Sequence, residues 1–241
     1  SVRAPAAAAG IVGLKFTPHV LEREGARFID DEHDCFGVLA RDLPTIGTLL
    51  EALGVDADRS VPPPRFVLDP MSPPLVADES RAERTARRSP WNEEEVGTIR
   101  KLIAVERAAR HLATLPIPLS SEARALRDFG LDPAHEPALR RAGARLQEIL
   151  AIARSELLAE EVFVARALRA PPPAVASDAD EAEVSRLLPL LPANLLGMAS
   201  IVLPPDLTGS DEPLQLSGWS EGVVMRAASR LSRRSSTRAR P

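Results

Sequence analysis

Hydrophobic and polar positions follow a helical period over residues 92–170, the most regular stretch of the chain. After Asn92, apolar residues recur every three or four positions, which places them on one face of a helix. They are Val96, Ile99, Leu102, Ile103, Ala109 and Leu112. Asn92 and Glu95 have the spacing of a capping box, and Pro116 and Pro118 interrupt the pattern. The pattern therefore predicts a helix that begins at Asn92 and ends before the prolines.

Two further helices are predicted in the same stretch. A short one can be capped by Ser120 or Ser121, and Gly130 stands where a left-handed C-terminal cap is favoured. A third helix begins near Asp132 and keeps its apolar period over 137–170. At about 1.5 Å per residue this helix would be roughly 50 Å long. Such a helix either projects toward a partner chain or forms the core of one larger domain.

The N-terminal part of the chain has a weaker pattern. Residues 1–10 are expected to form an extended or disordered arm. Short apolar runs predict strands at 11–16, 26–30 and 65–69. Pro44 opens a predicted helix that ends before Gly54.

The C-terminal part is expected to be helical, with proline interruptions. Ser177 or Asp178 can cap a helix through Leu188, and the apolar run 193–203 predicts another. A short strand at 214–216 and a last helix, with Val223, Val224, Ala227, Ala228 and Leu231 facing inward, complete the pattern.

The elements together predict a mainly α fold, an irregular multi-helix architecture with long proline-rich connections and at most a few short N-terminal strands. Twenty-three prolines divide the chain. Five regions are expected: an N-terminal arm and small mixed region (1–69), a linker (70–91), a central helical region (92–170), a second linker (171–180) and a C-terminal helical region with an arginine-rich tail (181–241).

Composition narrows the class of protein. The chain is 44% hydrophobic, so it can bury a core, but it is only 3% aromatic and has no tyrosine. One cysteine, Cys35, excludes an intrachain disulfide. The net charge of −4 excludes a general nucleic-acid binder by charge balance. The run 187–203 is interrupted by prolines and polar residues, so no membrane span is predicted. A reducing intracellular compartment, an organelle and a virion are all compatible.

Candidate metal sites do not complete their patterns. Asp30, Glu32 and Asp34 match the first three alternating ligands of a calcium loop. Cys35 then stands where glycine is needed, and Arg41 stands where the bidentate glutamate is needed. The four histidines, His19, His33, His111 and His135, are scattered, which disfavours a structural zinc site. The sequence therefore predicts a solvated acidic turn, with no metal and no cofactor.

One catalytic motif does occur, at residues 218–222. Gly-Trp-Ser-Glu-Gly has the Gly-x-Ser-x-Gly spacing of a nucleophile elbow, between a predicted strand and a predicted helix. This run of about a dozen residues resembles the elbow of the α/β-hydrolase family, which implies Ser220 as a nucleophile. That family places its acid and histidine after the serine, whereas no Asp and no His follows Ser220. The alternative is that Ser217 or Ser220 caps the last helix.

The C-terminal end carries a one-sided charge. Its last sixteen residues contain six arginines and no acid: Arg226, Arg230, Arg233, Arg234, Arg238 and Arg240. Such a run favours an anionic partner, either an acidic protein surface or nucleic acid. The other interpretation is a solvated tail.

The main functional expectation is a non-catalytic helical structural or interaction subunit of a larger assembly, with other protein subunits as partners. It rests on the long helix, the proline-broken connections and the incomplete catalytic sets. No catalytic residue is assigned under it. The alternative is a serine hydrolase, or a degenerate hydrolase-like fragment, that uses the elbow at Ser220.

Overall fold

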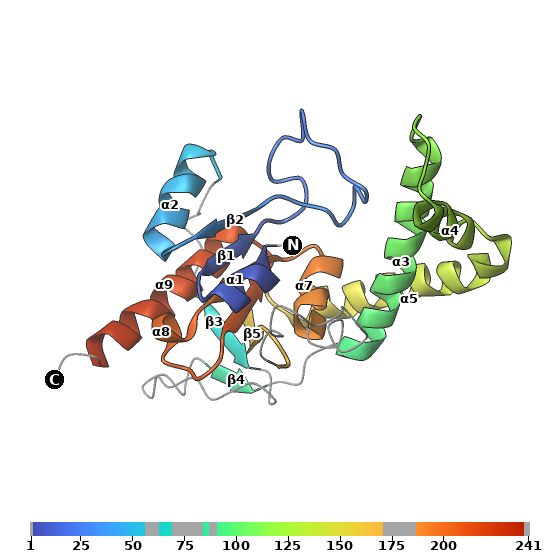
Figure 1. Cartoon of the computed structure of the whole chain (residues 1–241). Helices are drawn as coiled ribbons and strands as arrows, with labels where there is room; N and C mark the ends of the chain where they lie inside the picture. The colour runs from blue at the N-terminus through green and yellow to red at the C-terminus, as the bar shows by residue number, and fades with distance from the viewer. Residues whose placement is uncertain (1, 56–62, 69–83, 87–90, 171–186, 239–241) are drawn as a thin grey trace.

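The computed structural model describes residues 2–55, 63–68, 84–86, 91–170 and 187–238, and for 84–86 and 233–238 it describes the backbone alone. The strands are β1 (Val12–Lys15), β2 (Gly37–Ala40), β3 (Arg65–Leu68), β4 (Arg84–Ala86), β5 (Glu161–Arg166), β6 (Ala199–Leu203) and β7 (Leu214–Gly218). They form one seven-stranded sheet in the order β2-β1-β6-β7-β5-β3-β4 (Figure 1). Neighbouring strands are antiparallel in the part β2-β1-β6-β7-β5 and parallel in the part β5-β3-β4, so the sheet is mixed.

Helices cover both faces of this sheet. They are α1 (Arg3–Ala9), α2 (Leu43–Ala52), α3 (Glu93–Thr114), α4 (Ser121–Gly130), α5 (Glu136–Glu156), α7 (Leu191–Leu195), α8 (Pro205–Thr208) and α9 (Glu221–Arg238), with short 3₁₀ turns η2 (Pro133–His135) and η3 (Leu188–Leu190). One face packs against α2 and α9. The other packs against α1 at one end and against α3, α5 and α7 at the other. Figure 1 shows α3, α4 and α5 gathered on the side away from α2 and α9.

The central strands are buried on both faces. In β5, Val162 and Val164 contribute to the core beneath α9, while Phe163 and Ala165 contribute to the core beneath α3 and α5. All five residues of β6 and of β7 are buried. Burial on both sides removes the polar and apolar alternation that marks a one-sided strand. These segments therefore carry no strand period in the sequence.

The predicted mainly α fold class is wrong. The chain has an α/β architecture, and its strands come from the N-terminal, central and C-terminal parts rather than from the N-terminal part alone. The predicted continuation of the third helix to residue 170 is also wrong, because α5 ends at Glu156 and residues 161–166 form β5. The helix predicted over 193–203 is wrong for its second half, which forms β6. Short apolar runs fit a buried strand and a buried helix equally well, and here tertiary pairing selects the strand.

Two N-terminal predictions are wrong as well. The expected arm contains helix α1, whose Arg3 and Ala6 are buried. This helix lies so close to β1 that a Cβ atom added to Gly13 would stand 2.5 Å from the Ala6 Cβ. Residues 26–30, predicted as a strand, form no regular element.

Several other predictions are confirmed. The side chain of Asn92 accepts hydrogen bonds from the backbone N–H groups of Glu94 and Glu95, at 2.9 and 3.1 Å. Ser120 caps α4 through the N–H of Ala123, at 3.2 Å. The strands predicted at 11–16, 65–69 and 214–216 correspond to β1, β3 and β7.

Parts of the predictions lie outside the described residues. They are most of the linker 70–91, the linker 171–180 and the helix predicted to begin at Ser177 or Asp178. Within the described ranges, no helix is both long enough and apolar enough to cross a membrane.

The buried face of α5 offers a direct test of this architecture. Leu146 is 5% exposed and packs in the core shared by α3, α5 and β5. Leu146→Asp removes a buried side chain and leaves an unpaired charge there, so the free energy of unfolding should fall by at least about 3 kcal/mol. The measurement is urea unfolding followed by circular dichroism. Ile152 lies on the same helix and is 38% exposed; Ile152→Asp should change stability by less than about 1 kcal/mol. Equal losses in the two variants would contradict this packing.

Candidate functional site

The Gly-x-Ser-x-Gly motif occupies a strand-to-helix turn, as its sequence context predicted. Strand β7 ends at Gly218 and α9 begins at Glu221. A Cβ atom added to Gly218 would stand 2.9 Å from a methyl carbon of Val223, so the turn needs glycine there. The exposed Ser220 accepts a hydrogen bond at its Oγ from the N–H of Val223, at 3.3 Å. The hydroxyl therefore has the contact of a helix cap.

Ser220 would need a base beside it to act as a nucleophile. Within the described part of the chain, no histidine is hydrogen-bonded to it: Nδ1 of His33 contacts Asp30, and Nδ1 of His135 contacts the carbonyl of Phe129. A serine hydroxyl without a general base is a weak nucleophile. The elbow geometry alone thus does not make Ser220 reactive.

Glu221, the next residue, ties two distant segments together. Its carboxylate is 5% exposed and accepts from the N–H and the Oγ of Thr17, at 2.6 and 2.9 Å. The end of β1 is thereby fixed to the first turn of α9, where negative charge is favoured by the helix dipole.

A buried polar network lies on the α1 side of the sheet, and we call it the buried network. Its members are Arg3, Lys15, Ser200, Gln215 and Ser217, each at most 3% exposed. Lys15, Ser200 and Ser217 are successive cross-strand neighbours on β1, β6 and β7. Arg3 donates to Oε1 of Gln215 and to Oγ of Ser200, and the two serine hydroxyls are 2.9 Å apart. Lys15 donates to the carbonyls of Phe16 and Met198, at 3.0 and 2.9 Å.

Burial shifts the ionisation of both cations. Desolvation lowers the pKa of Lys15 to about 8, although the thiol of Cys35 acts in the opposite direction. Desolvation likewise lowers the pKa of Arg3 to about 10, and the Nε of Arg3 is buried without a hydrogen-bond partner. Strongly perturbed pKa values in a polar cluster are typical of functional sites, and they also occur in structural networks.

Sequence reasoning missed the buried network. One signal was present, because Lys15 is one of only two lysines and stands inside an apolar run that forms a strand. A charged residue in a fully buried strand needs polar partners. One partner is the carbonyl of the next residue, Phe16, but the other is the carbonyl of Met198, near the other end of the chain, and its position could not be read from the sequence.

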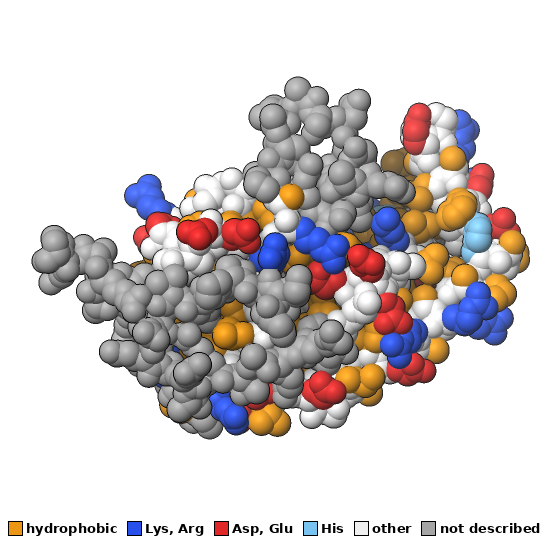
Figure 2. All heavy atoms as spheres, turned by 90° about the horizontal axis from the view of Figure 1, so that it is seen from below, with side chains coloured by type: hydrophobic (Ala, Val, Ile, Leu, Met, Phe, Trp, Pro, Cys, Tyr) orange, Lys and Arg blue, Asp and Glu red, His pale blue; other side chains and the backbone are white. Residues whose placement is uncertain are grey.

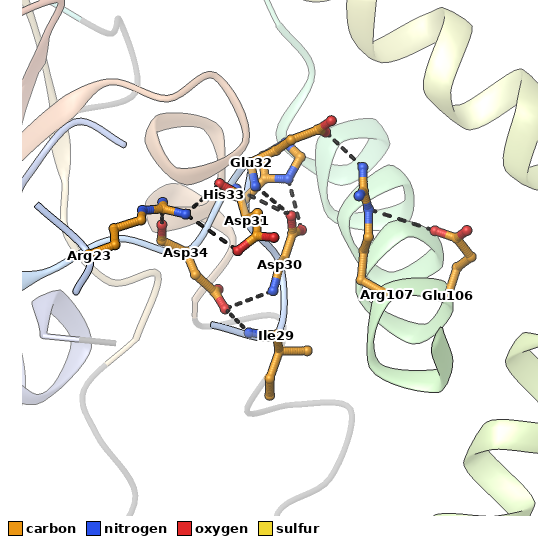
Figure 3. Close-up of polar contacts among 9 residues, drawn as sticks. All are labelled: Arg23, Ile29, Asp30, Asp31, Glu32, His33, Asp34, Glu106 and Arg107. Carbon is orange, nitrogen blue, oxygen red and sulfur yellow. Dashed lines mark hydrogen bonds and ion pairs between the residues drawn. The ribbon is translucent and has the colours of Figure 1, made fainter. Parts of the chain in front are cut away.

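The acidic segment before β2 forms a closed turn (Figure 3). Oδ2 of Asp34 accepts from the N–H groups of Ile29 and Asp30, both at 3.0 Å. Oδ1 of Asp30 accepts from the N–H groups of Glu32 and His33, and its Oδ2 lies 2.8 Å from Nδ1 of His33. Burial acts to raise the pKa of Asp30, but the charge and hydrogen bond of His33 outweigh it, and the pKa is lowered.

Asp30, Glu32 and His33 place potential ligand atoms within 4.8 Å of one another. This set differs from the calcium pattern, which used Asp34 instead of His33. Oε2 of Glu32 is 2.8 Å from the guanidinium of Arg107 on α3. Since the oxygens of Asp30 and Glu32 already accept from amide, imidazole and guanidinium groups, we assign no metal to them.

A cleft of about 300 Å³ lies beside this turn, between it and the helices α3 and α5. Ile103, Leu139 and Leu146 give it an apolar lining, and His33 and Gly143 also line it. Gln147 adds an uncharged polar side chain, and charged residues of both signs make up the rest: Glu32, Glu106, Glu136, Arg107, Arg110 and Arg140. Figure 2 shows the same mixture of charged and hydrophobic side chains over the coloured part of one face of the molecule.

Two of the six C-terminal arginine side chains, those of Arg226 and Arg230, are described. The guanidinium nitrogens of Arg226 are buried and have no hydrogen-bond partner among the described residues. Arg230 donates to the carbonyl of Pro64 at 3.3 Å and lies over the ring of Phe66. The side chains of Arg233, Arg234, Arg238 and Arg240 lie outside the described residues.

The lowered pKa of Lys15 predicts how the free energy of unfolding depends on pH. Between pH 8 and 10.5, Lys15 of the folded chain has lost its proton while the unfolded chain keeps it. The unfolded state then binds more protons, so this group makes stability rise with pH. At about 1.4 kcal/mol per pKa unit, the contribution is on the order of 3 kcal/mol.

Urea unfolding at pH 7.5 and pH 10 measures this contribution. In Lys15→Met, the free energy of unfolding should not show the rise between pH 7.5 and pH 10 that is expected for the unsubstituted chain. The exposed Lys101 on α3 provides the matched control, and Lys101→Met should keep this rise. If the free energy of unfolding changes equally with pH in the unsubstituted chain and in Lys15→Met, the lowered pKa of Lys15 is contradicted.

Comparison with known proteins gives a result at the level of structure only. No protein-family model and no curated protein sequence matches the chain. An amidase structure aligns with a TM-score of 0.73 at 21% identity, over 99% of this chain and 60% of the amidase. A 6-aminohexanoate cyclic dimer hydrolase complexed with substrate gives 0.74 at 14% identity, over 97% of this chain and 62% of the hydrolase. A bacterial aryl acylamidase of the amidase signature family gives a TM-score of 0.65 at 14% identity, over 100% of this chain and 63% of the acylamidase.

These similarities contradict the main functional expectation, a non-catalytic structural subunit or scaffold of an assembly. The three neighbours named above are an amidase, a cyclic dimer hydrolase and an aryl acylamidase, which fits the alternative, a hydrolase or hydrolase-like fragment, better than the main expectation. The chain has the α/β fold of amidase signature enzymes and spans about three fifths of the length of these three proteins.

Proposed function

We propose that this chain forms the larger part of a hydrolase that acts on carboxylic amides. One observation carries the proposal: the similarity to an amidase and to an aryl acylamidase extends over 99% and 100% of the chain. The likeness thus includes the sheet and the helices on both of its faces, rather than one motif.

The chemistry of amide hydrolysis sets what the site must contain. It needs a nucleophile, a base that activates it, and donors that stabilise the oxyanion. The described residues provide a rigid sheet with a polar network at the ends of β1, β6 and β7, but no serine paired with a base. In this proposal, groups outside the described residues complete the catalytic set, and Ser220 serves as a helix cap.

The proposal is tested with the whole gene product that contains this chain. It is incubated with acetanilide, benzamide and hexanamide, and the released amine or ammonia is quantified. We expect turnover of at least one amide, with loss of turnover after treatment with a fluorophosphonate. A folded protein that releases nothing from any of them would contradict the proposal.

Ser220→Ala serves as the internal control. It should lower stability by about 1 kcal/mol, because one helix cap is lost, and it should leave amide turnover unchanged. Loss of both turnover and fluorophosphonate labelling at Ser220 would instead identify the elbow serine as the nucleophile.

We further propose that the end of α9 contacts an anionic partner, through the four arginines that follow Leu231. The last described buried side chain of this helix is Leu231, so deletion of 232–241 should leave the core intact. Binding to a nucleic-acid duplex would weaken with a slope of about −0.9 in log affinity against log salt per phosphate neutralised. Binding to an acidic protein surface would depend on salt mainly through the association rate.

The test is a pull-down and titration of the full and shortened chains at 50 and 300 mM salt. The shortened chain should lose the salt-dependent part of binding. Unchanged binding after the deletion would show that the tail is only a solvated end.

A further inference from the structure

The cleft beside the acidic turn has an apolar floor formed by side chains that are otherwise part of the core. Ile103 and Leu146, on α3 and α5, are 8% and 5% exposed, and both contact the cleft. Gly143 lies one turn before Leu146, and a Cβ atom added there would meet no atom within 4 Å. The cleft therefore has space between the two helices that a larger residue at 143 would fill. Its volume is at the lower end of the range for small-molecule sites.

One polar group in this lining has a fixed orientation. Nδ1 of His33 is held by the carboxylate of Asp30 at 2.8 Å, and both side chains are buried (Figure 3). The backbone N–H groups of Glu32 and His33 hold the other oxygen of that carboxylate. An ionised Asp30 requires the proton on Nδ1, so Nε2 of His33 is a hydrogen-bond acceptor when the ring is neutral, the form that the ligand would bind, and a donor when the ring carries the charge that lowers the pKa of Asp30.

The charged residues around the cleft neutralise one another. Arg107 pairs with Glu32 at 2.8 Å, and Arg140 pairs with Glu136 at 2.7 Å. Arg110 pairs with Glu106. Three positive and three negative side chains leave no net charge, so the lining gives no electrostatic preference for an anion or a cation.

We propose that this cleft binds a small uncharged amide, with its apolar body between α3 and α5 and its N–H donating to Nε2 of His33. An apolar floor, charged side chains that pair with one another, and the imidazole held in place by Asp30 together match a neutral ligand that carries an N–H donor. The choice of an amide, among neutral N–H donors, rests on the proposed function. The cleft then supplies a subsite for one substituent of the substrate and for its N–H group.

Binding is measured by titrating benzamide into the ¹⁵N-labelled 241-residue chain and following backbone amide shifts by NMR. We expect saturable shifts confined to residues around Gly143 and His33. Gly143→Phe fills the space and should abolish saturation, whereas Gly143→Ala should bind as the unsubstituted chain does. Circular dichroism verifies that each variant is folded.

A second pair of ligands and a second variant isolate the hydrogen bond. N,N-Dimethylbenzamide keeps the ring and the carbonyl but has no N–H. His33→Asn retains a donor toward Asp30 and lacks the acceptor at the Nε2 position. The unsubstituted chain should bind benzamide about two- to tenfold more tightly than the dimethyl amide, the range of one net hydrogen bond. In His33→Asn this discrimination should disappear, which a merely structural role of His33 would not produce.

Three results would overturn the proposal: shifts that do not saturate, saturable binding that survives Gly143→Phe, or no discrimination between the two amides by the unsubstituted chain. Since binding is measured without turnover, the outcomes separate the two proposals. Amide hydrolysis by the gene product without binding in the cleft would contradict this inference alone. Binding in the cleft by a protein that hydrolyses no amide would contradict the proposed function alone.

Discussion

Burial of the central strands on both faces is the constraint on which the rest of this structure depends. β5, β6 and β7 have almost no exposed residue, so every side chain along them must be apolar or have a partner inside the protein. The apolar positions satisfy this by packing against α9 on one face and α3 and α5 on the other. In β6 and β7 the polar positions Ser200, Gln215 and Ser217 satisfy it through Arg3 and through one another, and in β5 the carboxylate of Glu161 accepts from the N–H of Leu158. A network of this kind is stable only when its members are paired, which fixes α1 against the sheet in one position.

The sequence predicted local features well, because their causes are local. The Asn92 and Ser120 caps, the end of the helix before Gly54 and the turn around Ser220 all follow from residues within a few positions of one another. The fold class was not predicted, because it depends on strand pairing over long distances. The apolar run 162–165 has no period of two, since Val162 and Phe163 are buried on opposite faces. Only the pairing of β5 with β7 and β3 distinguishes it from one more turn of α5.

The candidate site was predicted only in fragments. The acidic turn was recognised as a polar element, and its calcium pattern named Asp30, Glu32 and Asp34. That pattern left out His33, which the structure pairs with Asp30. No spacing rule relates that turn to Gly143 or Leu146, which come from a helix more than a hundred residues later. Arg3 and Lys15 were treated as parts of an arm and a short strand, although desolvation lowers the pKa of both. Burial, which the sequence does not display, gives both residues their distinctive chemistry.

The bond from Arg3 to Gln215 joins positions 212 residues apart. A ribosome that adds roughly 5–20 residues per second would need about 10–40 s between making the first and the second. During that interval β1 can pair with β2, but β6 and the polar residues of β6 and β7 have not yet been made. Contacts between such distant positions give a chain high contact order, and until synthesis is nearly complete the N-terminal segment has only its local contacts with β2 and α2.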